Sequence, residues 1–221
     1  DVYKRQQQYN RLLFCDSKKR IWAGGEMGIS VFNQVGTSLL PNTDFQIASV
    51  LKQAFVNCFY ETSSGYLWIG TRNGLFALKE SDKQFLQYTT ENGLPSNVIY
   101  GILEDAYGRL WISTNQGLSC LNPESGKFRN FTIMDGLQGN QFNAGAYCRK
   151  DNGYMLFGGV NGITSFRPET LIDNPYAPKP VINKLFVHNK EVLPDDETGI
   201  LKESITYVLS LIHISEPTRR R

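Results

Sequence analysis

Histidine is scarce in this chain, and long apolar runs are absent. The 221 residues include 2 histidines, His188 and His213, which is almost no raw material for a histidine-based metal site or a Ser-His-Asp relay. No run of eighteen apolar residues occurs, so the sequence predicts no membrane-spanning helix.

Excess positive charge is also missing once the two ends are set aside. Residues 1–6 (DVYKRQ) and 209–221 (LSLIHISEPTRRR) resemble translated sequencing-adapter sequence and match no other part of the chain, so both are expected to be non-native. These ends hold net charges of +1 and +2, so the formal charge of +2 becomes −1 without them. Because no basic stripe remains to neutralise phosphates, nucleic acid is not an expected partner.

The chain does contain one stretch that is copied four times. The copies cover residues 16–32, 61–78, 104–121 and 151–166, and each reads as a polar turn, a strand, a turn ending in Gly, and a second strand. A large apolar residue precedes a glycine by six positions in every copy: Trp22 and Gly28, Trp68 and Gly74, Trp111 and Gly117, Leu156 and Gly162. Successive copies are offset by 46, 43 and 45 residues. Short strands that repeat with a period in the forties indicate a β-propeller, whose blades are four-stranded sheets around a channel.

The two marker residues of the repeat have predicted structural roles. Each Trp falls on the second strand of a blade, where we expect its ring to be buried against the adjacent blade rather than to stack on a ligand. The glycine is expected to adopt φ > 0 in the turn between the second and third strands, which glycine does without steric cost.

The predicted fold class is all-β, with a partial β-propeller of about four blades of four-stranded antiparallel sheet over residues 7–172. Residues 33–49 are expected to form a long, irregular connection after the first blade. The fourth blade lacks an aromatic pair where its outer strand is due, so it is either incomplete or closed by a strand from the far end of the ring, which we favour. A Pro-rich linker over residues 173–180 and the start of a second β-domain over residues 181–208 follow.

Four cysteines are scattered without any CxxC spacing: Cys15, Cys58, Cys120 and Cys148. We expect small, buried apolar side chains, and a disulfide between neighbouring blades is the alternative. No residue pattern predicts a metal site, a catalytic residue or a cofactor.

Specific phrases connect the repeat to a known family. LWIGTRNGLFAL (67–78) and LWISTNQGLSCL (110–121), with GLPSNVIYGILED (93–105) and GLQGNQFNAGAYC (136–148), resemble the two-component regulator propeller repeat. SFRPETL (165–171), PKPVINKLFVHNKEV (178–192) and ILKESITY (200–207) resemble the passage from the last blades into the three-tyrosine, Ig-like β-sandwich of the same receptors. The resemblance covers residues 7–207, although the first blade departs from it at residues 23–26 and the fourth at Leu156.

The resemblance implies a sensor. Such propellers form the periplasmic region of hybrid histidine kinases of gut Bacteroidetes, which detect oligosaccharides released from complex glycans. The parent protein is then expected to be anchored in the inner membrane and homodimeric. This chain has no kinase segment, so it is expected to bind an oligosaccharide or another small ligand and to catalyse no reaction.

One end of the blades is the predicted ligand-binding face. An antiparallel four-stranded blade puts its second turn and the loop to the next blade at the same end. The candidate ligand-binding residues there are Arg72, Asn73, Asn97, Asn115, Gln116, Asn140 and Asn161. Their amides can bracket sugar hydroxyls, and the arginine can hold a uronate or a sulfate as a bidentate fork. Ordinary turn chemistry explains the same asparagines, because Asn tolerates the left-handed conformation.

The opposite end is expected to carry plain hairpin turns, with Glu104 and Asp105 as solvated turn residues rather than an acid/base pair or a cation site. Two other functions compete with the sensor. A propeller lyase or hydrolase would need a histidine or a carboxylate cluster on the ligand face, which blades two to four lack. A protein-docking propeller would need a large exposed apolar patch, for which Leu94, Pro95 and Leu137 are modest candidates.

Overall fold

The computed structural model describes residues 10–26, 28–42, 51, 53–79, 84–171 and 185–192. The chain divides into two compact units, residues 1–172 and 173–221. The expected non-native ends and the expected Pro-rich linker at 173–180 lie outside the described residues.

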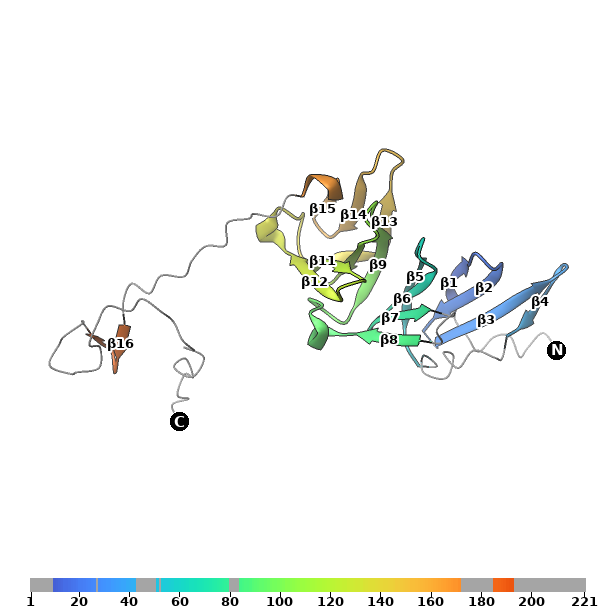
Figure 1. Ribbon diagram of the computed structural model, residues 1–221, viewed down its shortest axis with the longest axis horizontal. Coiled ribbons are helices and arrows are strands. Elements are labelled where there is room, and N and C mark those ends of the chain that lie inside the picture. Colours follow the sequence, from blue (N-terminus) through green and yellow to red (C-terminus); the bar gives the residue numbers. More distant parts are fainter. Residues whose placement is uncertain are drawn as a thin grey trace. The chain divides into compact units, whose positions relative to one another are not determined.

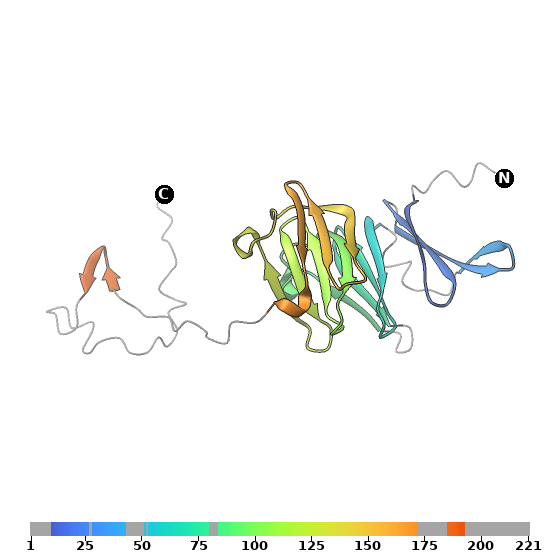
Figure 2. The ribbon, with the colours of Figure 1, turned by 90° about the horizontal axis from the view of Figure 1, so that it is seen from above.

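The first unit is a row of antiparallel sheets that follow one another in chain order (Figures 1 and 2). Blade 1 contains β1 (Asn10–Cys15), β2 (Arg20–Gly25), β3 (Gly28–Val35) and β4 (Ser38–Pro41). Blade 2 contains β5 (Val56–Glu61), β6 (Tyr66–Thr71), β7 (Gly74–Lys79) and β8 (Gln84–Tyr88). Blade 3 contains β9 (Ile99–Glu104), β10 (Leu110–Thr114), β11 (Gly117–Asn122) and β12 (Lys127–Phe131), and blade 4 contains β13 (Phe142–Arg149), β14 (Met155–Gly159) and β15 (Gly162–Phe166).

Short 3₁₀ helices connect or follow the later blades: η3 (Thr90–Asn92), η4 (Ile133–Asp135) and η5 (Pro168–Thr170). The all-β propeller prediction is confirmed, because each blade is an up-and-down sheet whose strands pair in sequence order.

The glycine of the repeat has the predicted backbone conformation in all four blades. The φ angles are 95° at Gly28, 120° at Gly74, 115° at Gly117 and 126° at Gly162. Each glycine is also the first residue of the third strand of its blade. A side chain at Gly117 would collide with the carbonyl oxygen of Phe131, so both backbone angle and space require glycine there.

The predicted structural role of the tryptophans is also confirmed. Trp22, Trp68 and Trp111 are at most 1% exposed, and each belongs to an apolar cluster shared by two neighbouring blades. Trp22 packs near Phe59 of blade 2, and Trp111 contacts Phe166 of blade 4 with ring centroids 4.7 Å apart. These three are the largest fully buried side chains among the described residues, and each ring can bury roughly 150 to 250 Å².

A buried aspartate fixes the first turn of blade 3, which corrects the expectation that Glu104 and Asp105 are solvated. Asp105 is 4% exposed. Its Oδ1 accepts hydrogen bonds from the backbone N–H groups of Tyr107 and Arg109, both at 2.9 Å. Its Oδ2 accepts from Arg109 Nε at 2.7 Å and from Trp111 Nε1 at 3.0 Å. The carboxylate is buried because four donors converge on it, which compensates the loss of water.

Blade 1 repeats this arrangement with Asp16. Its carboxylate accepts from the backbone of Lys18 and Arg20, from Arg20 Nε at 2.6 Å and from Trp22 Nε1 at 2.8 Å. Blade 2 has Thr62 at the equivalent position, and the indole N–H of Trp68 has no partner within the described structure.

A second carboxylate joins neighbouring blades. Glu61, at the end of β5, accepts hydrogen bonds from the backbone N–H and the hydroxyl of Ser17 in blade 1, both at 2.7 Å. Glu104, at the end of β9, accepts in the same way from Ser63 of blade 2, at 3.0 and 2.9 Å. We call this repeated contact the Ser-Glu clamp.

The clamp is replaced between blades 3 and 4. Ala106 stands at the serine position and Arg149 at the glutamate position. Arg149 Nη1 donates instead to the carbonyl oxygen of Glu104 at 2.7 Å. Glu104 is therefore a structural residue that holds two neighbouring blades, which is why it is buried.

The outer strands of blades 1 and 4 stand differently against their predictions. Residues 33–49 were expected to be irregular, but β3 extends to Val35 and a turn at Gly36 leads into β4, so that part of the prediction is wrong. The pattern was misleading because β4 (SLLP) has no aromatic pair, and all four of its residues are exposed. Blade 4 has three strands among the described residues, so the expectation that a distant strand completes it stays a prediction.

The described part of the second unit is one hairpin. β16 (Leu185–Val187) and β17 (Lys190–Val192) are joined by His188 and Asn189, which both have positive φ, as two-residue hairpin turns require. The expectation that this hairpin begins a second β-domain stays a prediction, because the other residues between 181 and 208 lie outside the described ranges.

Candidate functional site

Turns and inter-blade loops interlock on the predicted ligand face. The N–H of Gly74 donates to the carbonyl of Asn97 at 2.8 Å, and the N–H of Gly117 donates to the carbonyl of Asn140 at 2.6 Å. Each loop to the next blade is thus bonded to the second turn of the blade that it leaves. We call this end of the blades the upper face. It is formed by Glu26, by the turns at 72–73, 115–116 and 160–161, and by the loops at 89–98 and 132–141.

Asn97 and Asn140 have a structural duty in these loops. Their Oδ1 atoms accept hydrogen bonds from the backbone N–H groups of Thr90 and Ile133, both at 2.8 Å. These bonds hold the first residues of η3 and η4, so each amide has its Nδ2 donors and one lone pair of its oxygen left for a ligand. Side-chain bonding of this kind to a nearby N–H is the ordinary turn chemistry of asparagine.

Asn73 and Gln116 follow equivalent turns that are shaped by a threonine. Thr71 Oγ1 accepts from the N–H of Asn73 at 2.9 Å, and Thr114 Oγ1 accepts from the N–H of Gln116 at 3.0 Å. Both hydroxyls donate back to the carbonyl of the turn glycine at 2.8 Å. The turn therefore needs only the backbone of residues 73 and 116, and their side chains are exposed.

The two remaining predicted amides are Asn115 and Asn161. The Oδ1 atom of Asn115 is buried and has no partner within the described structure. Asn161 is exposed, and its N–H donates to Oε1 of Gln138 in the neighbouring loop at 2.7 Å. All seven predicted residues therefore lie on the upper face, spread over blades 2, 3 and 4.

Arg72 has an aromatic neighbour that the sequence analysis missed. Its guanidinium carbon lies 3.7 Å from the ring centroid of Phe55. The backbone N–H of Arg72 also donates a hydrogen bond to the backbone carbonyl of Phe55, at 3.0 Å. The guanidinium of Arg11, from blade 1, lies 5.6 Å from the same ring. Arg11 is also paired with Glu26 at 3.0 Å. Phe55 is not among the predicted site residues, because nothing in a linear pattern places an arginine from a turn seventeen residues later on its ring.

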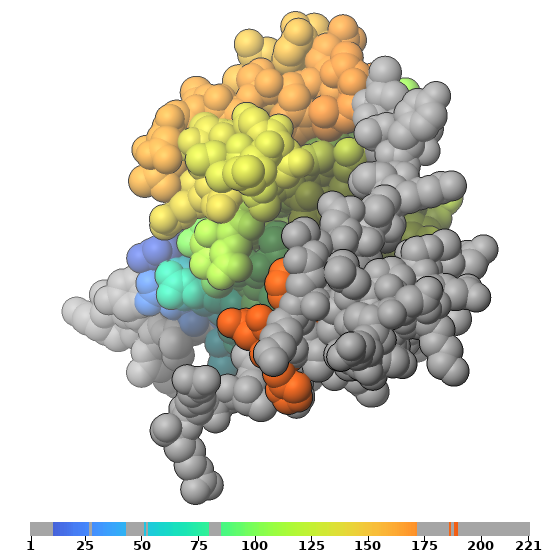
Figure 3. Space-filling view, turned by 90° about the vertical axis from the view of Figure 1, so that its left-hand side faces the viewer, coloured from blue at the N-terminus to red at the C-terminus, as the bar shows by residue number. Residues whose placement is uncertain are grey.

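Apolar side chains gather at the other end of the upper face. Met134 is 91% exposed and lies in the loop with η4, together with Ile133, and Val160 is exposed in the turn of blade 4. Figure 3 shows this loop, in yellow, directly beside blade 4, in orange. Of the three modest docking candidates, Leu94 and Leu137 are buried and Pro95 is half-buried, so these residues do not form a large exposed apolar patch.

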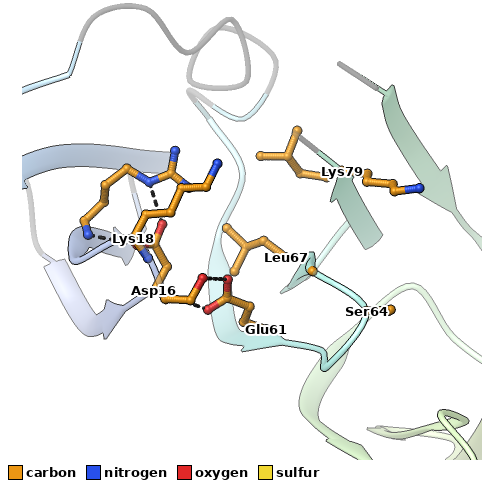
Figure 4. Close-up of a pocket in the computed structure, with 10 residues that line it drawn as sticks. Asp16, Lys18, Glu61, Ser64, Leu67 and Lys79 are labelled. Carbon is orange, nitrogen blue, oxygen red and sulfur yellow. Dashed lines mark hydrogen bonds and ion pairs between the residues drawn. The ribbon is translucent and has the colours of Figure 1, made fainter. Parts of the chain in front are cut away.

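A cleft of ≈ 290 Å³ opens between blades 1 and 2 on the opposite face. It is lined by Asp16, Ser17, Lys18, Arg20, Glu61, Ser64, Gly65, Leu67, Leu78 and Lys79 (Figure 4). Its two carboxylates are the aspartate that fixes the turn of blade 1 and the glutamate of the first Ser-Glu clamp. The cleft is therefore bordered by groups that hold the blades together.

The four cysteines are free thiols, and the prediction of burial is right for two of them. Cys58 and Cys120 are buried, and burial raises the pKa of Cys58 to about 12. Cys15 and Cys148 are exposed, because they lie on β1 and β13 at the two ends of the row of described blades. No helix in the described part of the chain is long and apolar enough to cross a membrane.

Comparison with known proteins identifies the repeats. Residues 51–73 and 93–116 match the model of the two component regulator propeller. Histidine kinase P4 of Formosa agariphila is 30% identical over 207 residues, which is 91% of this chain and 15% of the relative.

Two solved structures from B. thetaiotaomicron have the same fold. The extracellular domain of a protein assigned as a hybrid two component system superposes with a TM-score of 0.68 at 22% identity, covering 86% of this chain and 28% of that one. A second such domain gives 0.58 at 24% identity, covering 76% and 25%. The chain thus spans a small part of each protein that it matches. It carries two-component regulator propeller repeats, folded as consecutive blades of a β-propeller.

Proposed function

We propose that the chain is part of the periplasmic sensor propeller of a hybrid histidine kinase, and that its upper face binds an oligosaccharide. The observation that carries this proposal is the shared repeat: the propeller model matches two blades, and the curated relative is a histidine kinase. The parent is then a homodimer anchored in the inner membrane, and the phosphotransfer chemistry belongs to other parts of it.

The side chains of the upper face suit a polyhydroxylated ligand. Asn73, Gln116 and Asn161 are exposed, and the turn bonds around them use only their backbone groups. Amides offer both donors and acceptors, which is what vicinal sugar hydroxyls need. Blades 2 to 4 each contribute one such amide, so a chain of several sugar units can be contacted at several points.

The same face supports binding rather than catalysis. Glu26 is paired with Arg11, and Asp135 Oδ2 accepts from the backbone N–H of Thr132 at 2.7 Å. Two of the carboxylates on this face are therefore engaged in pairing or capping. General acid/base cleavage of a glycosidic bond needs two carboxyl groups that face each other across the substrate.

A thermal-shift screen tests the proposal. The complete extracytoplasmic region that contains this chain is melted with plant and host oligosaccharides, alongside the variant Gln116→Ala. A ligand at 100 times its Kd adds about 2.7 kcal/mol, which raises the Tm of a 150 to 250-residue domain by roughly 5 to 10 °C. We expect one glycan class to raise the Tm of the wild type, and Gln116→Ala to reduce that shift.

The matched control is Ser125→Ala, an exposed turn residue on the opposite face, which should leave the ligand-induced shift unchanged. If no saccharide changes the Tm of a cooperatively melting protein, the ligand proposal is wrong and a protein partner becomes the better reading.

A further inference from the structure

We propose that Arg72, which lies over Phe55 on the upper face with Arg11 beside the same ring, binds the oxyanion of an acidic saccharide, either a uronate carboxylate or a sulfate ester. We call the pair of Arg72 and Phe55 the arginine clamp. The inference rests on the proposed function and assigns it a ligand class. Its basis is the geometry, the charge and the distribution of these three residues over the blades.

The stacked geometry prepares Arg72 for an anion. At 3.7 Å from the ring centroid, the guanidinium of Arg72 rests against Phe55. Stacking uses the flat face of the guanidinium and leaves its in-plane N–H groups available as a fork. An arginine fixed in this way loses less side-chain entropy when it binds a carboxylate or sulfate with two parallel hydrogen bonds.

The local charge is positive and is concentrated on Arg72. Arg11 is neutralised by Glu26, at 3.0 Å, and both side chains of this pair are substantially exposed. Among the described residues, no carboxylate lies within ion-pair distance of Arg72. The ion pair keeps Arg11 near the ring, and Arg72 supplies the net charge of the cluster.

The pairing of Phe55 with Arg72 is absent from blades 3 and 4, although the backbone turn that carries it recurs. Phe55 and Arg72 correspond to Val98 and Asn115 in blade 3, and to Gln141 and Val160 in blade 4. The backbone N–H of Val160 still donates to the backbone carbonyl of Gln141, at 3.2 Å, just as the backbone N–H of Arg72 donates to the carbonyl of Phe55. The turn therefore forms without an arginine or an aromatic ring. A residue that the fold required would recur with the repeat, so the Phe-Arg pair points to recognition.

Affinity measurements on matched variants test the arginine clamp. Calorimetric titrations of the complete extracytoplasmic region use trigalacturonate, a sulfated chondroitin disaccharide and neutral cellotriose, with inorganic sulfate as a minimal probe. The variants are Arg72→Gln, which removes the charge, and Arg72→Lys, which keeps the charge but loses the fork. Arg129→Gln is the control, because Arg129 also lies over a phenylalanine, 4.8 Å from the ring centroid of Phe131, but on an outer strand.

We expect one acidic saccharide to bind, Arg72→Gln to weaken it roughly ten- to hundred-fold, and Arg72→Lys to recover only part of the loss. Arg129→Gln should bind like the wild type. Binding of trigalacturonate shows that a carboxylate is sufficient. Because the chondroitin disaccharide also carries a uronate, the sulfate is identified only if the sulfated disaccharide binds and its unsulfated counterpart, titrated in parallel, does not.

The outcomes separate this inference from the sensor proposal. If only neutral oligosaccharides bind, and Arg72→Gln binds them normally, the arginine clamp is refuted and the sensor proposal stands. If no saccharide binds but inorganic sulfate does so in an Arg72-dependent manner, Arg72 is an anion site and both the acidic-saccharide inference and the oligosaccharide proposal are refuted. Acidic ligands that bind Arg72→Gln with wild-type affinity overturn the arginine clamp directly.

Discussion

Blade 2 differs from blades 1 and 3 at the centre of its repeat. In blades 1 and 3 an aspartate accepts from two backbone N–H groups, an arginine and the tryptophan indole. In blade 2 Thr62 and Tyr66 replace the aspartate and the arginine, and the Trp68 indole N–H has no partner in the described structure. Yet Trp68 is as buried as the other two rings.

The comparison separates two contributions of the tryptophan. Apolar burial alone is enough to keep the ring between blades, since blade 2 retains it without the hydrogen bond. Two rings flank Trp68, Tyr66 at 6.0 Å and Tyr88 at 5.8 Å between centroids, just as two rings flank Trp111 in blade 3. The aspartate network is therefore an addition to a packed core. Its contribution to the free energy of unfolding can be measured by removing it from blade 3 and by introducing it into blade 2.

The largest expected effect comes from removing the network of blade 3. Asp105→Ala leaves the Trp111 indole, the Arg109 guanidinium and two backbone N–H groups without their acceptor. We expect a loss of about 3 to 5 kcal/mol in the free energy of unfolding, measured by denaturant titration. Thr62→Ala, the matched change in blade 2, should cost about 1 kcal/mol. Equal losses would mean that the aspartate adds nothing to the turn.

Transplanting the network into blade 2 should give a smaller, stabilising effect. The double variant Thr62→Asp with Tyr66→Arg supplies the Trp68 indole with an acceptor and the new carboxylate with a cation, and we expect a gain of about 1 kcal/mol. Thr62→Asp alone should give no gain, because a buried carboxylate without its guanidinium is costly. A double variant that is less stable than Thr62→Asp alone would contradict this account.

The smallest effect is a pH dependence that comes from Asp16 in blade 1. Burial by itself raises the pKa of Asp16, but the hydrogen bonds from Trp22 and Arg20 outweigh it and hold the pKa below its usual value. With the folded pKa below the unfolded value of about 3.9, the stability from ionised Asp16 is complete above that pH and is lost as the pH falls through the folded pKa.

We therefore expect the Tm difference between the wild type and Asp16→Asn to stay constant near neutral pH and to shrink below about pH 4. Thr62→Ala is the control, and its Tm difference should not follow this curve. An Asp16→Asn difference that persists unchanged into strong acid would show that the carboxylate charge is irrelevant.

Spacing predicted the parts of the fold that depend on local chemistry. Gly74 and Gly117 were assigned positive φ because a tight turn at that point needs it, and Trp68 and Trp111 were assigned to the interface because a large ring recurs on one strand. The upper face was predicted from strand direction alone. The prediction that a polar turn residue is exposed was wrong for Asp105. Its carboxylate is buried because Arg109 and Trp111, which follow the turn in the chain, donate hydrogen bonds to it.

The candidate site was predictable only in outline. Asn97 was a candidate ligand-binding amide with turn chemistry as the alternative, and its oxygen does accept a hydrogen bond that closes the loop that carries it. Phe55 was missed because its contact with Arg72 depends on the register between the start of β5 and the turn after β6. Side-chain partners across strands follow from three-dimensional register, which a linear pattern does not encode.

The Ser-Glu clamp has a consequence for how such a chain can grow. Blade 2 offers Ser63 to the blade that follows and Glu61 to the blade that precedes, so it carries both halves of its own attachment. A duplicated copy of this segment can therefore bond to its template on one side and to the next blade on the other, and blade number can change by gene duplication alone. Ala106 and Arg149 mark the junction where that interchangeability has been given up.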